Sequence, residues 1–216
     1  MNQEKYLEVF PFRRMEYADA MDRQLQLVEK CIESGGSENF LLPVEHPPVI
    51  TLGRSADQND ILSSGELLKR RGVKVIETNR GGKITFHGPG QLVIYPIVDL
   101  RGRGKDLHRY LRELECWIIE LLSFIGLEAY TTPPYTGVWA EGGKIASIGI
   151  AVRRWIAYHG VALNVNPDMN FFDHIVPCGL QEAGMVSLES LGLAPASLEE
   201  VANEAAELFR KLFGFP

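Results

Sequence analysis

The residue types most suited to binding a substrate lie together at residues 80–91. This stretch holds four glycines, a histidine and two cationic side chains. Glycine permits a ligand to approach the backbone closely, and exposed amide groups in such a turn can bind a carbonyl oxygen or an anion. The alternative is an ordinary glycine-rich turn with Arg80 in solvent and His87 in a structural role. Composition alone leaves both interpretations open.

Cys178 is the second candidate, because the tripeptide Pro-Cys-Gly places its thiol in an irregular segment, where active groups often lie. A free thiol has a pKa of about 8.5, so a nucleophilic cysteine needs a nearby cation or base. Lys144, His159 and His174 are candidate partners, although sequence spacing does not establish contact. The alternatives are a buried, inert Cys178 and a Lys144 that is a solvated charge at a strand edge.

Spacing disfavours two other kinds of site. Residues 80–91 lack the Gly-Lys-Ser/Thr ending of a phosphate-binding loop and do not precede a helix. A zinc site built from Cys178, His174 and His159 lacks the paired spacing of common zinc ligands. The two remaining cysteines, Cys31 and Cys116, lie inside helical patterns, and we interpret them as structural.

The elements that must position these residues follow from hydrophobic periodicity. Runs rich in β-formers predict strands at residues 6–12, 40–44, 49–52 and 73–76. Apolar residues at steps of three and four predict helices over residues 15–31, 107–125 and 197–212, with a shorter helix over residues 65–71. The candidate groups therefore lie mainly on strands and on the turns between them.

Two antiparallel hairpins are predicted around the candidate residues. One joins residues 83–87 to residues 91–95 through Gly88-Pro89-Gly90, and the other joins residues 144–152 to residues 156–165 around Arg153-Arg154. Strands and helices do not alternate regularly. We therefore predict an α+β fold with mixed, largely antiparallel sheets flanked by helices, in a single domain over residues 1–216.

The bulk composition excludes several classes of protein. A net charge of −6 over 216 residues argues against a general binder of nucleic-acid phosphates. No run approaches the roughly 18 apolar residues that suggest a membrane span. The three cysteines are widely spaced, unlike the dense even sets of secreted scaffolds. We expect a soluble, cytoplasmic protein with free thiols.

A series of motifs runs through most of the chain between His46 and Ser187. They are Arg-Gly-Gly at 80–82, Thr-Phe-His-Gly-Pro-Gly-Gln-Leu-Val at 85–93, Tyr-Pro at 95–96, Gly-Val-Trp at 137–139, Lys-Ile-Ala-Ser-Ile-Gly at 144–149, His-Gly-Val-Ala-Leu-Asn at 159–164 and Pro-Cys-Gly at 177–179. In order and spacing, this series closely resembles the lipoyl (octanoyl) transferases, which share a fold group with lipoate and biotin protein ligases.

The resemblance implies an acyltransferase with the fold of the biotin and lipoate protein ligase catalytic domains. In that family, the residue matching Cys178 carries an acyl thioester, and the residue matching Lys144 lowers the pKa of that thiol and relays protons. The resemblance also implies the residues that line the acyl substrate site: Arg80, Gly81, Gly82, Lys83, Ile84, Thr85, Phe86, His87, Ser147, Ile148, Gly149, Gly160, Val161 and Ala162.

The resemblance further implies the partners. The donor is octanoyl-acyl carrier protein, which delivers the acyl group on phosphopantetheine, and the acceptors are lipoyl domains of 2-oxo acid dehydrogenases and the glycine cleavage H protein. No ATP, metal or other cofactor is expected, because exchanging a thioester for an amide is downhill. We expect a monomer with neither nucleic-acid nor membrane partners.

Basic groups that could dock an acidic donor are Arg13-Arg14, residues 69–71, Arg101, Arg103 with Lys105, and Arg153-Arg154.

Two alternatives follow from the same sequence. A lipoate protein ligase would activate a free acid as an adenylate and would need no cysteine nucleophile, so Cys178 and the motif at residues 87–91 argue against it. A non-catalytic module that binds an acyl chain or a lipoyl domain would use Lys144 and Cys178 only to shape a pocket. That module would bind without turnover.

Overall fold

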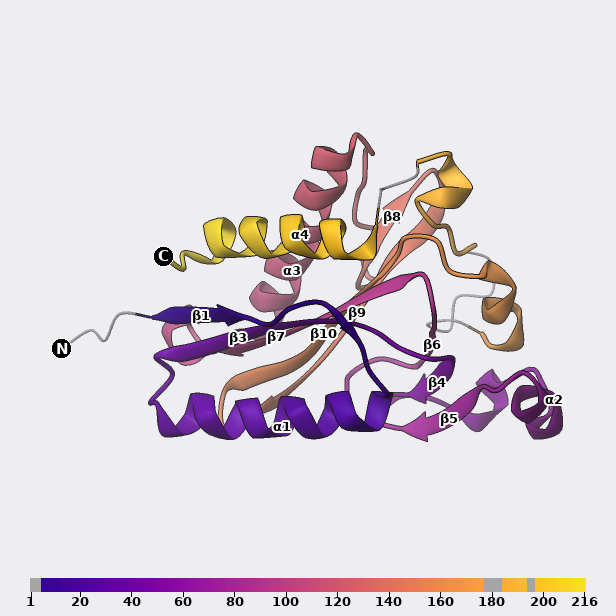
Figure 1. The fold of residues 1–216 in the computed structure, drawn as a ribbon, viewed down its shortest axis with the longest axis horizontal. Coiled ribbons are helices and arrows are strands. Elements are labelled where there is room, and N and C mark those ends of the chain that lie inside the picture. Colours follow the sequence, from indigo (N-terminus) through magenta and orange to yellow (C-terminus); the bar gives the residue numbers. More distant parts are fainter. Residues whose placement is uncertain (1–4, 177–183, 194–196) are drawn as a thin grey trace.

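The computed structural model describes residues 5–176, 184–193 and 197–216, and the described strands form two sheets (Figure 1). The large sheet has seven strands, in the order β1 (Tyr6–Val9), β3 (Glu38–Glu45), β7 (Gln91–Asp99), β10 (Ile156–Asn164), β9 (Gly143–Arg153) and β8 (Val138–Ala140), with β2 (Arg13–Arg14) beside β3. The small sheet has three strands, in the order β5 (Lys74–Glu77), β4 (Val49–Leu52) and β6 (Ile84–His87).

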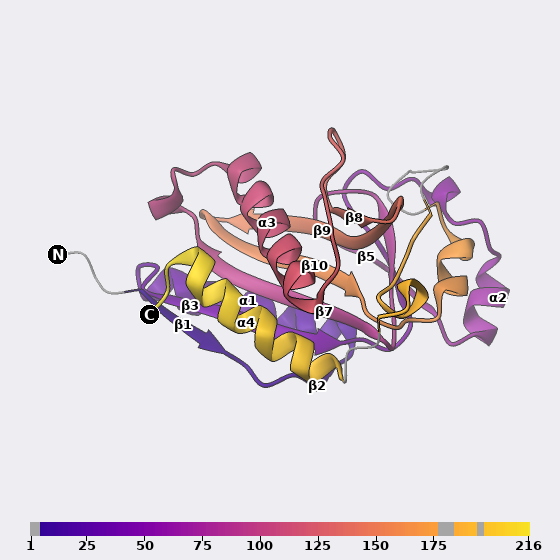
Figure 2. The ribbon, with the colours of Figure 1, turned by 90° about the horizontal axis from the view of Figure 1, so that it is seen from above.

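Helices cover both faces of the large sheet. Helix α1 (Tyr17–Glu33) packs against β3, β7 and β10 on one face, while α3 (Leu107–Ile125) and α4 (Leu198–Phe213) cover the other (Figures 1 and 2). Helix α2 (Gly65–Arg70) lies beside the small sheet (Figure 1), and short 3-10 helices occur at Gln58–Asp60, Arg101–Arg103, Met169–His174 and Glu189–Leu191. Among the described residues, no helix combines the length and apolar character needed to cross a membrane.

The core divides along the large sheet because side chains alternate along each strand. Leu41 belongs to the core beneath α3 and α4, whereas its neighbour Leu42 belongs to the core beneath α1. On the first side, the indole N–H of Trp117 donates to the carbonyl of Ala205 over 2.8 Å, which ties α3 to α4. Cys31 is fully buried in the second core, as its position in the apolar stripe predicts.

The α+β fold class is confirmed, and so are several of its elements. The helix predicted over residues 107–125 is α3, which begins after Asp106, whose side chain accepts from the Arg109 amide, and ends at Gly126 with φ 92°. The hairpin of β9 and β10 is also confirmed. Its turn lies at Arg154 and Trp155, which have φ values of 50° and 66°.

The other predicted hairpin is wrong. Strand β6 pairs with β4 in the small sheet, whereas β7 lies between β3 and β10 in the large sheet. The segment from Gly88 to Gly90 therefore connects two sheets, and the Gly90 amide donates to the Glu45 carboxylate over 2.8 Å. Every residue of both strands is buried, and the alternation of apolar and polar residues along β6 distinguishes the two faces of the strand but does not identify its partner.

Candidate active site

A cavity of about 270 Å³ lies where β6 of the small sheet meets β7, β9 and β10 of the large sheet. Most of the residues expected at the substrate site line it. They are Arg80, Gly82, Lys83, Thr85, His87, Ser147, Ile148, Gly149, Gly160, Val161 and Ala162, together with Lys144. Segments far apart in the sequence are thus brought together around one space, because β9, β10 and β7 are neighbours in the sheet.

Three of the expected residues, Gly81, Ile84 and Phe86, are not among the lining residues. Ile84 and Phe86 alternate with Thr85 and His87 along β6, so they point into the core of the small sheet. The amide of Gly81 donates to the carbonyl of Ile150 over 2.8 Å, which fixes the preceding turn against β9.

Sequence reasoning missed other residues in the cavity wall. They are Tyr17 on α1, Val93 and Tyr95 on β7, and the loop residues Pro134, Tyr135 and Thr136. Because successive side chains of a strand point to opposite faces, the sequence of β7 could have placed Val93 and Tyr95 on the same face. The loop carries no periodic signal, and only the fold brings it beside β9.

Arg80 is held inside the protein rather than in solvent, so its interpretation as a solvated side chain is wrong. Its side chain donates to the hydroxyl of Thr51 from Nε over 3.2 Å and from Nη2 over 2.9 Å, and Nη2 also reaches the Thr51 carbonyl at 2.7 Å. Nη1 donates to the carbonyl of Gly81 over 3.1 Å. These contacts fix the glycine-rich turn to the small sheet.

Two imidazoles in the wall are neutral because they are buried. Burial lowers the pKa of His87 and that of His159 to about 3 each. The Nδ1 atom of His87 lies 2.7 Å from the side-chain oxygen of Gln91, and Nε2 of His159 lies 2.8 Å from the side-chain oxygen of Asn79. Since an amide oxygen only accepts, each of these ring nitrogens carries the proton.

A third imidazole supports Tyr95 from behind the cavity wall. Burial lowers the pKa of His46 to about 4. Its Nδ1 donates to the carbonyl of Met15 over 2.7 Å, which leaves Nε2 to accept from the hydroxyl of Tyr95 at 2.8 Å. This part of the wall is therefore built from uncharged, hydrogen-bonded rings, which an apolar ligand can contact without exposing an unpaired charge.

The pairing of β10 with β7 is interrupted beside the cavity, between Ala157↔Val98 and Val161↔Ile94. Pro96 has no amide hydrogen, and it lies in the interval of β7 that faces His159. His159 adopts φ 57°, and its amide donates instead to Gln24 on α1 over 2.8 Å. A side chain on Gly160 would collide with the carbonyl oxygen of Ile94 and with Pro96, so glycine is required for the strands to approach.

Lys144 is buried, with only 2% of its surface exposed, so its interpretation as a solvated edge charge is wrong. Its Nζ atom donates to the carbonyl of Thr136 over 2.9 Å and lies 5.0 Å from the centre of the Trp139 ring. The backbone of Lys144 accepts from Val186 and donates to Gly184, which follows residues 177–183. Cys178 itself lies outside the described residues.

The other candidate groups lie elsewhere. His174 is a buried residue whose Nδ1 is 2.7 Å from the hydroxyl of Ser63, and it is not among the residues that line the cavity. Burial raises the pKa of Cys31 to about 12, which keeps its thiol protonated, whereas Cys116 is exposed on α3. Within the described ranges, no group of three His, Cys, Asp or Glu residues is arranged to hold a metal ion.

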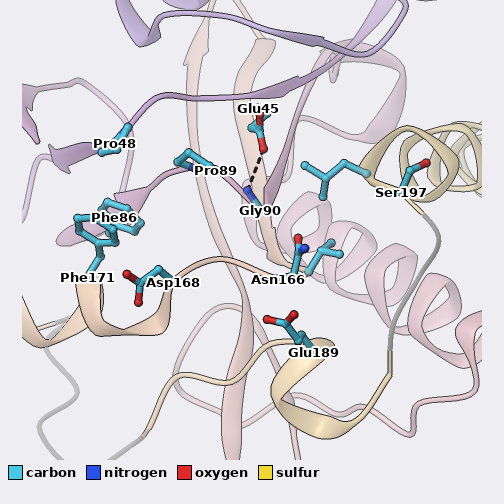
Figure 3. A pocket seen from close by; sticks show the side chains of 12 residues that line it. Glu45, Pro48, Phe86, Pro89, Gly90, Asn166, Asp168, Phe171, Glu189 and Ser197 are labelled. Carbon is cyan, nitrogen blue, oxygen red and sulfur yellow. Dashed lines mark hydrogen bonds between the residues drawn. The ribbon is translucent and has the colours of Figure 1, made fainter. Parts of the chain in front are cut away.

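A larger cavity, of about 600 Å³, has an acidic wall (Figure 3). It is lined in part by Glu45, Asp168, Glu189 and the stacked rings of Phe86 and Phe171. Glu45 accepts from the Gly90 amide, as the dashed line in Figure 3 marks, and Asp168 caps a 3-10 helix. None of the described residues lining it is a lysine, arginine, histidine or cysteine, so the smaller cavity is the candidate active site.

Comparison with known proteins gives a consistent assignment. Residues 16–210 match the family model of the lipoyl protein ligase A/B catalytic domain. An octanoyltransferase of Solibacter usitatus is 45% identical over 202 residues, which cover 94% of this chain and 90% of the relative. One from Rubrobacter xylanophilus is 48% identical over 202 residues, covering 93% of this chain and 90% of the relative.

Solved structures agree on the fold. The putative lipoate protein ligase Ta0514 from T. acidophilum with bound lipoic acid gives a TM-score of 0.72 at 16% identity, covering 99% of this chain and 87% of that protein. A lipoate-protein ligase A bound with ATP gives 0.74 at 16% identity, with coverage of 98% and 86%. Biotin protein ligase from Aquifex aeolicus, in complex with biotin and ATP, gives 0.56 at 12% identity, with coverage of 97% and 71%.

The ligase structures share too little sequence with this chain to indicate more than the fold. The octanoyltransferases, in contrast, are similar along nearly the whole chain, with 94% and 93% of it covered. The chain therefore belongs to the lipoyl protein ligase A/B catalytic domain family and, within it, groups with the octanoyltransferases.

Proposed function

We propose that this protein transfers an octanoyl group from octanoyl-acyl carrier protein to a lysine of lipoyl domains, through a thioester on Cys178. The observation that carries the proposal is the buried amine of Lys144 in the wall of a cavity built from the predicted substrate-site segments. Relatives named octanoyltransferase, which are 45% and 48% identical to this chain, support the acyl group and the reaction class.

In the first half-reaction, the thiolate of Cys178 attacks the thioester carbonyl of the donor. A carbon–sulfur bond to Cys178 forms, the bond to the carrier's sulfur breaks, and the carrier leaves as a thiol after taking a proton from the Lys144 ammonium. A nearby cation favours the thiolate because it stabilises the charged form of the nucleophile. Lys144 is left as a neutral amine.

In the second half-reaction, a neutral lysine amine of the lipoyl domain attacks the acyl-enzyme. An unperturbed lysine has a pKa of about 10.4, so the acceptor first loses its ammonium proton to solvent, and the neutral amine loses a second proton as it forms the amide. The neutral Lys144 amine accepts that proton as the amide forms, and Cys178 leaves as a thiolate. The starting protonation states of both residues are thereby restored.

The cavity supplies the binding part of this scheme. About half of its lining residues lie on three adjacent strands, from Lys144 on β9 to Val93 on β7. Two strand spacings amount to about 10 Å, a length of the order of an extended medium-length acyl chain. Apolar contacts from Val93 and Ala162, which share one face of the sheet, suit such a chain, and each buried methylene contributes about 0.8 kcal/mol.

The scheme uses no ATP, metal or other cofactor, since both half-reactions exchange one acyl bond for another. We propose lipoyl domains of 2-oxo acid dehydrogenases and the glycine cleavage H protein as acceptors, and a monomer acting in the reducing cytoplasm. Of the basic groups considered for docking the donor, Arg14, Arg101, Arg103 and Arg153 form ion pairs within the chain. Residues 69–71 are therefore the first candidate for the surface that docks the donor.

The proposal is tested by transfer assays with purified octanoyl-acyl carrier protein and a lipoyl domain, with and without ATP. We expect transfer without ATP, loss of transfer in Cys178→Ser, and slower acylation and slower delivery in Lys144→Ala. A strict need for ATP, with a fully active Cys178→Ala variant, indicates instead the ligase reaction. Tight binding of the acyl donor without turnover indicates the non-catalytic module.

A further inference from the structure

The carboxylate of Glu115 is buried, and it contacts the backbone of Gly137, next to the Thr136 carbonyl that Lys144 contacts. Glu115 on α3 has a side chain that is 1% exposed, and its Oε1 atom accepts from the amide of Gly137 over 2.9 Å. Such a group is costly to bury, and desolvation raises its pKa, whereas the Gly137 amide and the charges of Arg112 and Lys144 lower it. A carboxylate kept in this position needs an explanation beyond packing.

The amide that Glu115 binds and the carbonyl that Lys144 binds belong to the same peptide unit. The carbonyl of Thr136 accepts from the Lys144 Nζ atom over 2.9 Å, and the N–H of Gly137 donates to Glu115. A peptide unit is planar and rigid, so fixing its N–H also fixes the direction of its C=O. An acceptor on the N–H also strengthens the carbonyl as an acceptor, since linked hydrogen bonds polarise one another.

The backbone at Gly137 lies against the Lys144 side chain and leaves it little room to move. It has φ 139°, a conformation that residues with a side chain rarely adopt. A Cβ atom at this position would lie 2.6 Å from the carbonyl oxygen of Ala146 and would collide with the Lys144 side chain. The backbone of the loop and the stem of Lys144 are therefore packed directly against each other.

Arg112 completes the arrangement one turn earlier on α3. Its guanidinium approaches Oε2 of Glu115 at 2.7 Å as an ion pair, and its Nη2 reaches the hydroxyl of Thr136 at 3.4 Å. The arginine is 45% exposed, so it compensates the buried charge from the solvent side. The oxygen that faces the loop remains dedicated to the Gly137 amide.

We propose that Glu115 is a positioning residue for Lys144, acting through the peptide unit between Thr136 and Gly137. Glu115 does not contact the cavity itself; it sets the direction of the carbonyl that holds the lysine amine. The consequence for turnover rests on the proposed acyl transfer, whereas the effect on the Lys144 amine does not. Glu115 positions Lys144 mainly through the hydrogen bond that it accepts from the Gly137 amide, and less through its negative charge.

Three variants separate these contributions. Glu115→Leu removes the acceptor, while Glu115→Gln keeps an oxygen that can accept from the Gly137 amide and removes the charge. Glu113→Leu is the matched control, because Glu113 lies on the same helix and ion-pairs with Arg103 and Arg109, away from the cavity lining. Each variant is compared with the parent in kcat and KM for octanoyl-acyl carrier protein, and in thermal unfolding.

We expect Glu115→Leu to lower kcat about 100-fold, the typical cost of a small misplacement at a reacting group, with KM for the donor changed less than threefold. Glu115→Gln should recover kcat to within about tenfold of the parent, and Glu113→Leu should retain it. An unchanged kcat in Glu115→Leu, a Gln variant as slow as the Leu variant, or equal losses in Glu113→Leu would each overturn the proposal.

A second measurement needs no turnover. Trace labelling of amines with acetic anhydride, followed by peptide mass spectrometry, reports the accessibility of Lys144 relative to the other lysines. We expect its labelling to rise several-fold in Glu115→Leu and to stay near the parent value in Glu115→Gln and Glu113→Leu. Unchanged labelling in Glu115→Leu contradicts the positioning role. Failure of the parent protein to transfer octanoyl groups, with the labelling pattern as expected, counts against the proposed function alone.

Discussion

Val93 on β7 and Ala162 on β10 are direct register partners in the large sheet, and both line the cavity. They lie two strands and one strand away, respectively, from β9, which carries Lys144. This pair therefore lies on the β7 side of the cavity, where the proposed transfer would place the end of the acyl chain.

Ala162→Leu is expected to shift the preference toward shorter acyl chains, because a larger side chain takes the space of the terminal methylenes. Each displaced methylene costs about 0.8 kcal/mol, or about fourfold in kcat/KM. The measurement is kcat/KM for butanoyl, hexanoyl and octanoyl donors. Ala157→Leu is the control, since Ala157 lies on the same strand but is buried in the core beneath α3 and α4. A uniform loss for all donors in Ala162→Leu contradicts this placement of the chain end.

The three buried imidazoles predict a loss of stability in mild acid. Burial lowers the pKa of His46, His87 and His159 in the folded state to between about 3 and 4, whereas an unfolded histidine has a pKa near 6.5. Between these values the unfolded chain binds more protons, so stability is full above about pH 6.5 and falls as the pH drops. Each histidine contributes at most about 1.4 kcal/mol per pH unit in this window.

Urea unfolding at pH 7, 6 and 5 measures this slope. His159→Gln should reduce it, whereas His108→Gln, which changes an exposed histidine on α3, should leave it unchanged. A parent protein whose unfolding free energy does not change between pH 7 and pH 5 contradicts the neutral, buried state of these rings.

Gly160→Ala is expected to destabilise the fold by about 1–3 kcal/mol, the usual cost of forcing an extra carbon into a packed site. The new methyl group would collide with the carbonyl oxygen of Ile94 and lie 2.6 Å from Cδ of Pro96. Gly65→Ala is the control, because a Cβ atom at the start of α2 meets no other atom within 4 Å. Thermal unfolding of both variants tests the requirement; equal melting temperatures for the two would argue against it.

The sequence predicted the helices better than the strand partners, for a physical reason. Helix α3 is determined by local spacing and by its ends at Asp106 and Gly126, so its bounds follow from neighbouring residues. Strand pairing depends on contacts between distant segments, and the buried strands β6 and β7 carry no local sign that they belong to different sheets.

In the candidate site, too, the parts marked by local sequence were predicted and the parts that depend on distant contacts were not. Motif resemblance identified most of the cavity wall, because the glycine-rich turn and β9 and β10 carry specific residues. It did not identify Tyr17, Tyr95 or Thr136, which α1, β7 and a loop bring to the cavity. Nor does local sequence reveal that Glu115, 29 residues before Lys144, binds the peptide that orients it.

The most direct test of the account is mass spectrometry of the protein after brief mixing with octanoyl-acyl carrier protein. The account predicts a single octanoyl group on the peptide that contains Cys178, linked as a thioester that hydroxylamine cleaves, and lost when a lipoyl domain is added. An octanoyl group on Cys31 or Cys116 instead, or no acyl-enzyme while transfer proceeds efficiently, would contradict the covalent relay through Cys178.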